Sequence, residues 1–556
     1  MLFGHEIEGN IIFQDKKFDK YYIRKMVKRY KKNLNKLCCK KEDVVAICLE
    51  RGIEFVICVL ACLESGITFL PIDTAHPQKR IKYMLNNAGI KLLVTEDSAF
   101  EEEFSICSIE KLTVKNYFGI RKKYVSDIAY ILYTSGTTGL PKGVEVTRRG
   151  FENQLCYLPN HINMEGCKSV LALSSFSFDV FLLETVIPLY YGMNVVLADQ
   201  KEQNNPKKIC KLIRKYDIDF LQTTPSRLRL INAVDSNYCF LSSLKTICVG
   251  GEPFPSNVLT NLQKKTSARI FNLYGPTETT MWATVSELTD KANVDIGKPI
   301  ENMELFIWNE KKQNVQLNQC GELVIGGVGV AKGYINNQEE TNKRFIIDSK
   351  LNKRVYLTGD IVKFDNNGDL LFLGRKDNQI KHLGNRIELE EIDKCLEKIE
   401  GIDIGITCYD YESKKIIAFI KKSKELNENN IFEMLKQYLP KYMIPEKIVS
   451  IDQLNYTRTG KIDRKKILQN FVNQGDDKKN ETNGKTIFTN YVEQILGRTI
   501  DTSIPILDIN IDSILYVELI VKLEEKYNIE FETEKLSVSE FECFDEIYEY
   551  IMEKID

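Results

Sequence analysis

Histidine is rare in this sequence, and long apolar runs are missing. Only four of the 556 residues are histidine and none lies near a cysteine pair, so a structural zinc site is not expected. The Gly-x-Ser-x-Gly turn of serine hydrolases is also missing. The most apolar stretch covers residues 55–63, whereas a membrane-spanning helix needs about twenty residues. The first residues do not form a basic segment followed by an apolar one, so a signal peptide is not expected either. These absences predict a soluble protein.

Cysteine is plentiful, but its spacing suits neither disulfides nor a metal. The fifteen cysteines are odd in number and scattered, and no two have the C-x-x-C spacing. Cys38 and Cys39 are adjacent, and neighbouring cysteines have poor geometry for a disulfide. This pattern is typical of a reducing compartment. We therefore expect a cytoplasmic protein.

Charge is nearly balanced over the whole chain but not along it. The net charge is −2, which gives no reason to expect binding to nucleic acid or to a membrane. Residues 485–556 contain 17 acidic and 6 basic side chains, so the rest of the chain is basic overall. Residues 474–485 are polar and aperiodic, which favours a flexible linker over a long surface loop.

Short apolar runs alternate with amphipathic segments from about residue 40 to 375. This alternation predicts parallel sheets with crossover helices. From about 378 to 468 the runs are shorter and the charges denser, which predicts a small α+β domain. The last 70 or so residues show no strand alternation and are expected to be helical. The β-branched runs that predict strands cover residues 44–49, 92–95, 170–173, 194–198 and 244–249.

Residues 133–144, YTSGTTGLPKGV, form the most informative segment. It contains three glycines, four Ser or Thr hydroxyls and one lysine, and it follows the apolar run 128–132. Glycines let backbone N–H groups approach an anion, hydroxyls donate further hydrogen bonds, and Lys142 adds a positive charge. These residues suit a polyphosphate, although the ending of the Walker loop is missing. Taken alone, the segment could also be a linker.

Further motifs show which family the segment resembles. In chain order they are LESGITFLPID (63–73), FD (178–179), NLYGPTETT (272–280), GEL (321–323), YLTGD (356–360), GRKDNQIK (374–381), LPKYMIP (439–445) and GKIDR (460–464). Together with the phosphate loop, they resemble the adenylate-forming superfamily, including the adenylation domains of nonribosomal peptide synthetases. The resemblance covers nearly the whole chain and implies a large α/β core with parallel sheets.

The resemblance implies an ATP site and a role for each of its residues. Tyr274 would lie against adenine, Asp360 would accept hydrogen bonds from the ribose, and Glu278 would bind Mg²⁺. Lys461 would stabilise negative charge as the amino-acid carboxylate attacks the α-phosphate, giving aminoacyl-AMP and pyrophosphate. The catalytic set is Lys461, Glu278 and Lys142, and the ATP-binding set is Thr134, Ser135, Gly136, Thr137, Thr138, Gly139, Lys142, Asn272, Tyr274, Gly275, Thr277, Asp360, Phe372 and Arg375.

The resemblance also implies a division into domains. We expect an adenylation core over residues 1–376, a mobile small subdomain over 377–470, a linker over 471–484 and a carrier domain over 485–556. Asp377 would be the hinge about which the small subdomain turns between the two half-reactions. Relative to the family the chain starts late, so part of the first helix is expected to be missing.

Ser513 is the expected attachment site for 4′-phosphopantetheine. It starts a segment in which residues 516, 519, 520, 523 and 527 form one apolar helical face, and on physical grounds alone it would be the helix N-cap. The segment resembles a four-helix carrier domain, although NIDSI (510–514) replaces the usual Gly-Gly-Asp-Ser-Leu. A phosphopantetheinyl transferase is therefore an expected partner.

Asp179 matches the family position whose carboxylate binds the α-ammonium of an amino acid. A fatty or aryl acid would leave this buried charge unpaired, at a cost. Motif alignment completes the substrate set, which is bulky, has no second charge and resembles the glycine-selective pattern. We expect glycine, with alanine next. The set is Asp179, Val180, Leu183, Gln222, Ile247, Val249, Leu273, Met281, Trp282 and Lys461.

Two other functions remain open. One is a different adenylating ligase, such as an acyl-CoA synthetase or a D-alanine ligase of the cell-wall type. The other is a carrier scaffold without catalysis. No two histidines adjoin, so the His-His motif of condensation domains is missing. A condensing or modifying enzyme is therefore expected to act on the loaded amino acid in trans.

Overall fold

The computed structural model describes residues 2, 4–38, 40–114, 125–136, 139–235, 238–349, 352–411, 413–424, 426–451, 454–455, 462–474, 484–509, 511, 513–527, 529–532, 535 and 540–555. The chain forms two compact units. The first comprises Met1–His76, Ile81–Thr134 and Pro141–Asp377, and the second comprises Pro77–Arg80, Ser135–Leu140 and Asn378–Asp556. Each unit is described separately below.

A seven-stranded sheet carries the phosphate loop. Its strands from β7 to β6 are parallel, whereas β8 and β18 pair antiparallel to their neighbours. The parallel strands are buried on both faces, as their continuous apolar runs require. Across the sheet the order is β18 (Gly333–Tyr334), β8 (Lys142–Thr147), β7 (Ile128–Thr134), β4 (Thr68–Pro71), β3 (Val44–Cys48), β5 (Leu92–Thr95) and β6 (Ile106–Cys107).

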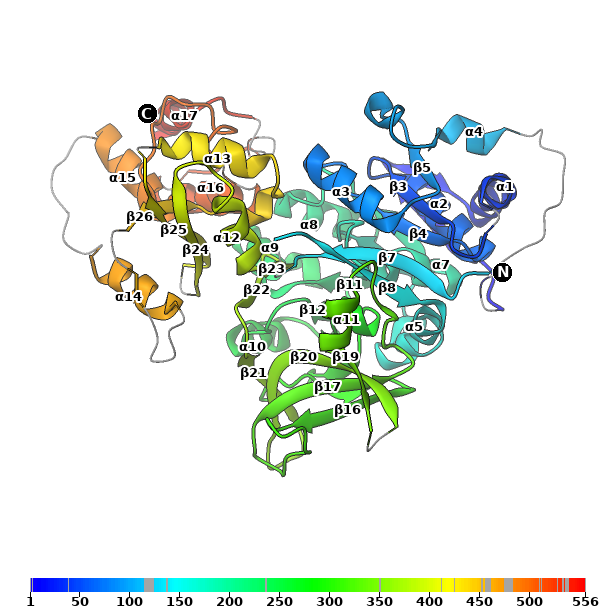
Figure 1. The fold of residues 1–556 in the computed structure, drawn as a ribbon. Coiled ribbons are helices and arrows are strands. Elements are labelled where there is room, and N and C mark those ends of the chain that lie inside the picture. The colour runs from blue at the N-terminus through cyan, green and yellow to red at the C-terminus, as the bar shows by residue number, and fades with distance from the viewer. Residues whose placement is uncertain are drawn as a thin grey trace. The chain divides into compact units, whose positions relative to one another are not determined.

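A nine-stranded sheet forms the second half of the core (Figure 1). It is parallel from β13 to β1 and antiparallel at both ends. One apolar cluster contains residues of both sheets, including Phe69 and Phe220. The order is β15 (Lys298–Pro299), β14 (Thr284–Glu287), β13 (Arg269–Tyr274), β12 (Thr246–Gly250), β11 (Phe220–Thr223), β9 (Ser169–Ala172), β10 (Asn194–Leu197), β1 (Asn10–Phe13) and β2 (Lys16–Phe18).

An antiparallel five-stranded sheet completes the first unit. The strands are β16 (Met303–Trp308), β17 (Gly321–Gly327), β20 (Lys353–Phe364), β19 (Phe345–Asp348) and β21 (Leu370–Arg375), with β21 paired to β20. The register places Asp360 opposite Arg375.

Helices cover the sheets of the first unit, and α2 lies within the core. It contains the run 55–63, and all of its residues except Glu54 and Glu64 are buried. A helix that is apolar on all sides is expected to lie inside the protein. The helices are α1 (Lys20–Leu37), α2 (Ile53–Ser65), α3 (Gln78–Ala88), α4 (Ile109–Thr113), α5 (Arg148–His161), α6 (Val180–Glu184), α7 (Val186–Tyr190), α8 (Pro206–Lys215), α9 (Pro225–Val234), α10 (Ser256–Lys265) and α11 (Gln338–Arg344).

The second unit begins with a small α+β fold. A three-stranded sheet and a separate hairpin pack with two helices around a core that includes Ile387, Ile392 and Ala418. The elements are β22 (Gln379–His382), β23 (Asn385–Glu388), α12 (Leu389–Leu396), β24 (Ile402–Asp410), β25 (Lys415–Lys422), α13 (Glu428–Lys436), β26 (Lys447–Ser450) and α14 (Arg464–Gln474).

The helix α14 continues into the segment expected to be a linker. Phe471 packs against Phe419, with ring centres 5.6 Å apart, and this apolar contact explains why the helix extends to Gln474. At the other end, α15 already begins at Gly484. The helix α14 therefore includes the first residues of the expected linker 471–484, and α15 begins at its last residue.

The C-terminal segment is helical, as expected. Its described part holds α15 (Gly484–Leu496), α16 (Ser513–Tyr527) and α17 (Phe544–Ile555). The predicted apolar face of α16 is buried, with Tyr516, Leu519, Ile520 and Leu523 in one core. The α/β core, the small α+β subdomain and the helical carrier confirm the predicted fold class.

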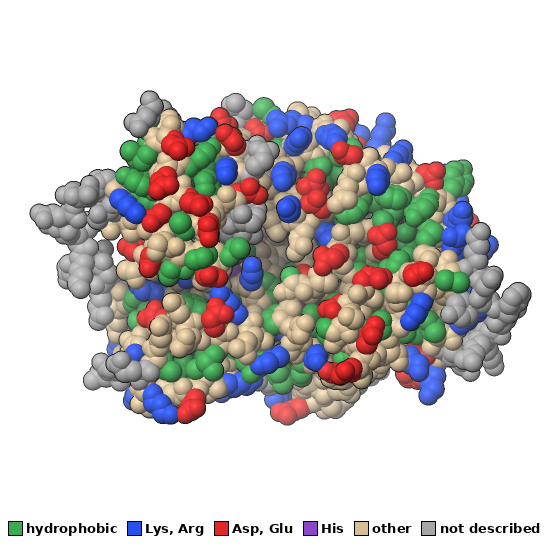
Figure 2. Space-filling view, turned by 90° about the horizontal axis from the view of Figure 1, so that it is seen from above, with side chains coloured by type: hydrophobic (Ala, Val, Ile, Leu, Met, Phe, Trp, Pro, Cys, Tyr) green, Lys and Arg blue, Asp and Glu red, His purple; other side chains and the backbone are tan. Residues whose placement is uncertain are grey.

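The described surface carries both signs of charge. Figure 2 shows acidic and basic side chains interspersed over the face seen from above. Within the described residues, no helix combines the length and the apolar character needed to cross a bilayer. The fourteen cysteines in this part of the chain are free thiols.

Candidate active site

The phosphate loop connects two antiparallel strands. Thr134 ends β7 and Lys142 begins β8, and the two residues face each other in the register. Thr137 and Thr138 lie outside the described residues. Gly139 has φ +81°, and a Cβ there would lie 2.6 Å from the Lys394 side chain, so this turn requires glycine. In the second unit, the Ser135 hydroxyl donates to the Arg386 carbonyl, 2.9 Å away, and the Gly136 N–H donates to Glu391 at 3.0 Å.

Lys142 is buried and lies among groups of opposite charge and aromatic character. Its side chain is 5% exposed, and its Nζ lies 3.7 Å from Glu340 Oε1. The same Nζ lies 4.8 Å from the centre of the Tyr334 ring. The ammonium is thus held in place beside the phosphate loop.

Tyr274, Asp360 and Arg375 form the expected adenosine side of the site. The Tyr274 hydroxyl donates to Asp360 Oδ2, and Arg375 donates to Asp360 Oδ1 at 2.5 Å. Phe372, on the same strand as Arg375, faces Val362 in the register. The structure therefore brings together these residues from three strands and holds the Asp360 carboxylate between an aromatic and a cationic side chain.

The turn after β13 is too tight for any residue but glycine at position 275. A Cβ there would lie 2.6 Å from both Ala283 N and Met281 O. Before the turn, the Asn272 side chain donates to the Asp295 carbonyl at 2.7 Å.

Glu278 is completely buried in a short 3₁₀ turn (Thr277–Thr279). Its Oε1 accepts a hydrogen bond from the Tyr334 hydroxyl at 2.8 Å, and its carbonyl accepts from Ala331 N at 2.9 Å. Mg²⁺ prefers oxygen donors and commonly binds one or two carboxylates together with substrate phosphates. A single buried carboxylate that shares its neighbour Tyr334 with Lys142 fits that ion on donor chemistry.

Asp179 is buried where the amino-acid end of the site is expected. Its Oδ2 accepts from Met281 N at 3.1 Å, and the Thr277 side chain also donates to it. Burial raises the pKa of Asp179 to about 6, partly offset by these hydrogen bonds. A positive group at this position would stabilise the carboxylate.

A strained turn positions Met281 and Trp282. Thr280 and Met281 have φ of 63° and 65°, a region that is costly for residues other than glycine. The Thr280 hydroxyl donates to the Gly329 carbonyl at 2.6 Å, and Asp179 accepts from Met281 N. These two hydrogen bonds hold the turn in its strained conformation. Backbone strain of this kind is common at functional sites.

Most of the predicted substrate residues share one apolar environment. Leu183, Leu273, Met281 and Trp282 belong to the same core cluster, and Val180 packs against it. Gln222 points to this side of the nine-stranded sheet, because its register partner Cys248 belongs to that cluster as well.

Ile247 and Val249 differ from the rest of this set in the sheet face on which they lie. Side chains alternate along a strand, and both residues belong to the core on the opposite face of the sheet. On the face of Gln222 and Leu273, the β12 residues paired with them in the register are Cys248 and Gly250.

Gly250 is the more informative of these two residues, neither of which motif alignment had placed in the substrate set. A Cβ at Gly250 would lie 2.6 Å from Trp282 Cη2 and 2.7 Å from the Leu273 carbonyl oxygen. The indole therefore packs directly on the Gly250 backbone. The alternation of β12 relative to Gln222 could have identified this position from the sequence.

Asp377, the expected hinge, is the last residue of the first unit. Its carboxylate accepts from Arg375 at 2.6 and 2.8 Å and from Arg344 at 3.4 Å. Arg375 thus bonds to Asp377 as well as to Asp360.

Besides Thr137 and Thr138, two more predicted residues lie wholly or partly outside the described part of the chain. Lys461 lies outside the described residues. Ser513 is the first residue of α16, rather than the N-cap that precedes a helix, and its side chain is outside the described part of the chain.

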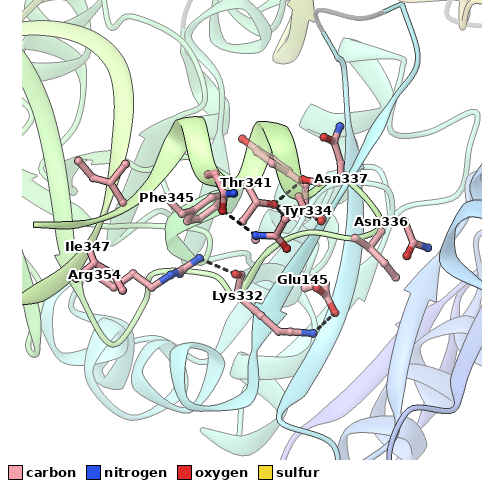
Figure 3. Close-up of a pocket in the computed structure, with 14 residues that line it drawn as sticks. Glu145, Lys332, Tyr334, Asn336, Asn337, Thr341, Phe345, Ile347 and Arg354 are labelled. Carbon is pink, nitrogen blue, oxygen red and sulfur yellow. Dashed lines mark hydrogen bonds and ion pairs between the residues drawn. The ribbon is translucent and has the colours of Figure 1, made fainter.

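A depression of about 990 Å³ lies beside β18 and α11 (Figure 3). Its lining includes Tyr334, Thr341 and Phe345, but none of the predicted site residues. We therefore do not assign the ATP or amino-acid site to it.

Comparison with known proteins identifies the two parts of the chain. Residues 22–335 match the family of AMP-binding enzymes. The chain belongs to this family. Residues 487–551 match the phosphopantetheine attachment site. The chain is therefore an AMP-binding adenylation domain fused to a C-terminal carrier domain, as the motifs predicted, and ATP, Mg²⁺ and 4′-phosphopantetheine are the cofactors of such proteins.

The curated relatives of this AMP-binding enzyme are much longer peptide synthetases. Bacitracin synthase 1 of Bacillus licheniformis is 34% identical over 81% of this chain, which spans 9% of that protein. The dimodular nonribosomal peptide synthase of Bacillus subtilis is 32% identical over 82% of this chain, which spans 20% of it.

Solved structures confirm the fold of the AMP-binding enzyme and its carrier. PA1221, described as a nonribosomal peptide synthetase protein with adenylation and carrier domains, superimposes with a TM-score of 0.79 at 22% identity, over 94% of this chain and 90% of its own. The four-domain synthetase AB3403, solved with AMP and glycine, is 25% identical with a TM-score of 0.61, over 98% of this chain and 42% of its own.

Proposed function

We propose that this chain activates glycine as glycyl-AMP and transfers it as a thioester to its own carrier domain, with alanine as the next-best substrate. The observation that carries the proposal is the buried Asp179 carboxylate beside the apolar wall of Leu183, Leu273 and Trp282. One end of this arrangement suits an α-ammonium, and the other leaves little room for a side chain.

Asp179 supports an amino acid rather than a fatty or aryl acid as the substrate. Desolvation raises its pKa, so the ionised form is unfavourable until a cation offsets the cost. An α-ammonium is such a cation. A substrate without one would leave the carboxylate in contact only with groups of the protein.

The packing of Trp282 on Gly250 supports a very small amino acid. With no side chain at position 250, the indole packs against the strand and occupies space that a substrate side chain would need. An apolar site discriminates between two substrates that differ by one methylene by about 1–3 kcal/mol. The synthetase AB3403, whose structure is similar to that of this chain, was solved bound to AMP and glycine.

The residues described above suit adenylation of the carboxylate. Tyr274 and Asp360 bind adenosine, while Ser135, Lys142 and backbone N–H groups bind the phosphates. Lys461 stabilises the charge that develops as the carboxylate oxygen attacks the α-phosphorus and pyrophosphate leaves. Glu278 would hold Mg²⁺, which would supply positive charge to offset that of the phosphates.

Loading and later steps involve the carrier and other proteins. Phosphopantetheine, when attached to Ser513, supplies a thiol for the second half-reaction. We propose a phosphopantetheinyl transferase and a condensing or modifying enzyme as partners, in the cytoplasm, where the free cysteines of the described chain stay reduced.

The test is amino-acid-dependent ATP–pyrophosphate exchange across the twenty common amino acids and D-alanine. A maximum with glycine supports the proposal, and a maximum with another L-amino acid keeps the enzyme class but rejects the substrate. Preference for D-alanine would favour a cell-wall type of ligase. With Mg²⁺ and folded protein present, silence across the panel would favour a carrier scaffold without catalysis.

A further inference from the structure

Tyr334 lies in the strand next to the one that starts with the phosphate-loop lysine. The strand β18 pairs antiparallel with β8, and the register places Tyr334 opposite Val144. Lys142 is two residues from Val144 on the same strand, so it shares a sheet face with Tyr334. Both residues are buried.

One side chain therefore contacts two groups of opposite charge. The face of the Tyr334 ring lies 4.8 Å from Lys142 Nζ, within the range of a cation–π interaction. Its hydroxyl donates to Glu278 Oε1 at 2.8 Å. The hydroxyl constrains the orientation of the carboxylate while the ring supports the ammonium.

The helix α11 fixes Tyr334 from behind. The Thr341 hydroxyl oxygen accepts from Tyr334 N at 2.9 Å and donates to the Asn337 carbonyl at 2.8 Å; Figure 3 shows these residues beside one another. Gly333 has φ +145°, and a Cβ there would lie 2.6 Å from Thr341 Cγ2. The backbone before Tyr334 is thus held closely against the helix.

We propose that Tyr334 is a positioning residue of the adenylation site, which sets the relative placement of the Mg²⁺ ligand Glu278 and the phosphate-binding Lys142. The proposal rests on the roles given to those two residues in the proposed function. Tyr334 itself need not contact ATP. Removal of its hydroxyl would leave a buried carboxylate without one of its donors, while the ring would still support Lys142.

The test compares Tyr334→Phe with the unmodified full-length chain by two binding measurements. Electron paramagnetic resonance measures Mn²⁺ binding in the presence of a non-hydrolysable ATP analogue, and calorimetry measures binding of AMP alone. Loss of an outer hydrogen bond to a metal ligand typically costs about 10–100-fold, so we expect Mn²⁺ affinity to fall about 10-fold or more. AMP affinity, which does not need the metal, should be unchanged and shows that the variant is folded.

Two further variants sharpen the comparison. Tyr334→Leu removes the ring as well, so affinity for the ATP analogue should fall about a further 5-fold relative to Tyr334→Phe, the size of a cation–π contact. Tyr190→Phe is the matched control. Tyr190, on α7, is also buried, and its hydroxyl donates to Glu64 at 3.3 Å. This variant should leave Mn²⁺ affinity unchanged.

The outcomes separate this proposal from the proposed function. Unchanged Mn²⁺ affinity in Tyr334→Phe, or an equal loss of Mn²⁺ and AMP affinity, overturns the positioning role. Metal–nucleotide binding that depends on Tyr334 in a chain without amino-acid-dependent exchange would keep the positioning role and reject the function. A wild-type chain that binds no Mn²⁺ with the nucleotide analogue would reject both.

Discussion

At the scale of single residues, we expect Asp179 to decide the class of substrate. Its carboxylate is 5% exposed and accepts from the Met281 amide, and we expect it to pair with the α-ammonium. Asp179→Asn removes the charge but keeps the shape. Loss of one partner from a buried charge pair costs about 2–5 kcal/mol, so kcat/KM for the amino acid should fall about 30-fold or more.

The measurement for this variant is ATP–pyrophosphate exchange at several amino-acid concentrations, together with calorimetric binding of AMP. Asp127→Asn is a suitable control, because Asp127 is an exposed aspartate paired with Lys41. An Asp179→Asn variant that keeps normal kcat/KM for glycine would show that the ammonium binds elsewhere.

The raised pKa of Asp179 predicts a pH dependence with a definite sign. The carboxylate form binds an ammonium and the neutral form does not. Since burial raises the pKa of Asp179 in the free protein to about 6, kcat/KM for glycine should be constant well above pH 6. Below pH 6 it should fall by about tenfold per pH unit, because kcat/KM reports groups of the free enzyme.

Exchange assays across pH 5–8 with saturating ATP check this expectation, with protein stability measured at each pH. The Asp179→Asn variant should lack the descending limb near pH 6. A limb that persists in this variant would assign the titration to another group.

At the scale of elements, we expect the strand β12 to decide how much space the substrate has. Gly250→Ala places a Cβ 2.6 Å from Trp282 Cη2 and 2.7 Å from a backbone carbonyl oxygen, so the indole must move. Overpacking of this kind costs about 1–3 kcal/mol. We expect kcat/KM for glycine to fall about tenfold, with a change in the ratio of glycine to alanine activity.

Kinetics with glycine and alanine measure this effect, and Gly166→Ala provides the control. A Cβ at Gly166 would meet no atom closer than 3.5 Å, and its φ is not positive. If Gly250→Ala behaved as the control does, the packing of Trp282 on Gly250 would have no part in selectivity.

The same strand shows what the sequence could and could not predict. The five strands expected from β-branched runs are present as β3, β5, β9, β10 and β12, because an apolar run of that length favours a buried parallel strand. The face of each strand is harder to predict. An alignment error of one residue moves every side chain of a strand to the opposite face of the sheet. Motif alignment selected Ile247 and Val249, whereas Cys248 and Gly250 lie on the face of Gln222 and Leu273.

The contacts of Tyr334 could not be predicted for a different reason. They depend on the pairing of β18 with β8, two short segments about 190 residues apart whose sequences carry no local signal for each other. Glu278 and Lys142 were identified by motif, but their common neighbour becomes visible only when the sheet is assembled.

At the scale of the whole molecule, the two half-reactions use separable residues. The described groups expected to bind adenosine and the amino acid, Asp360 and Asp179 among them, belong to the first unit, whereas Ser513 belongs to the second. Activation should therefore proceed without the attachment serine, because adenylation requires no thiol.

Ser513→Ala tests this separation. Amino-acid-dependent ATP–pyrophosphate exchange should stay within about twofold of the wild-type chain, since the substitution removes one hydroxyl at the start of α16 and, at most, a helix-end contribution of about 1 kcal/mol. After incubation with a phosphopantetheinyl transferase and coenzyme A, intact-protein mass spectrometry should show the added phosphopantetheine on the wild-type chain and none on Ser513→Ala. Radiolabelled glycine should remain on the wild-type chain alone.

Two outcomes would contradict this separation. Addition of phosphopantetheine to the Ser513→Ala chain would place the attachment at another serine. Loss of both exchange and loading in Ser513→Ala would mean that the carrier helix supports the activation step itself.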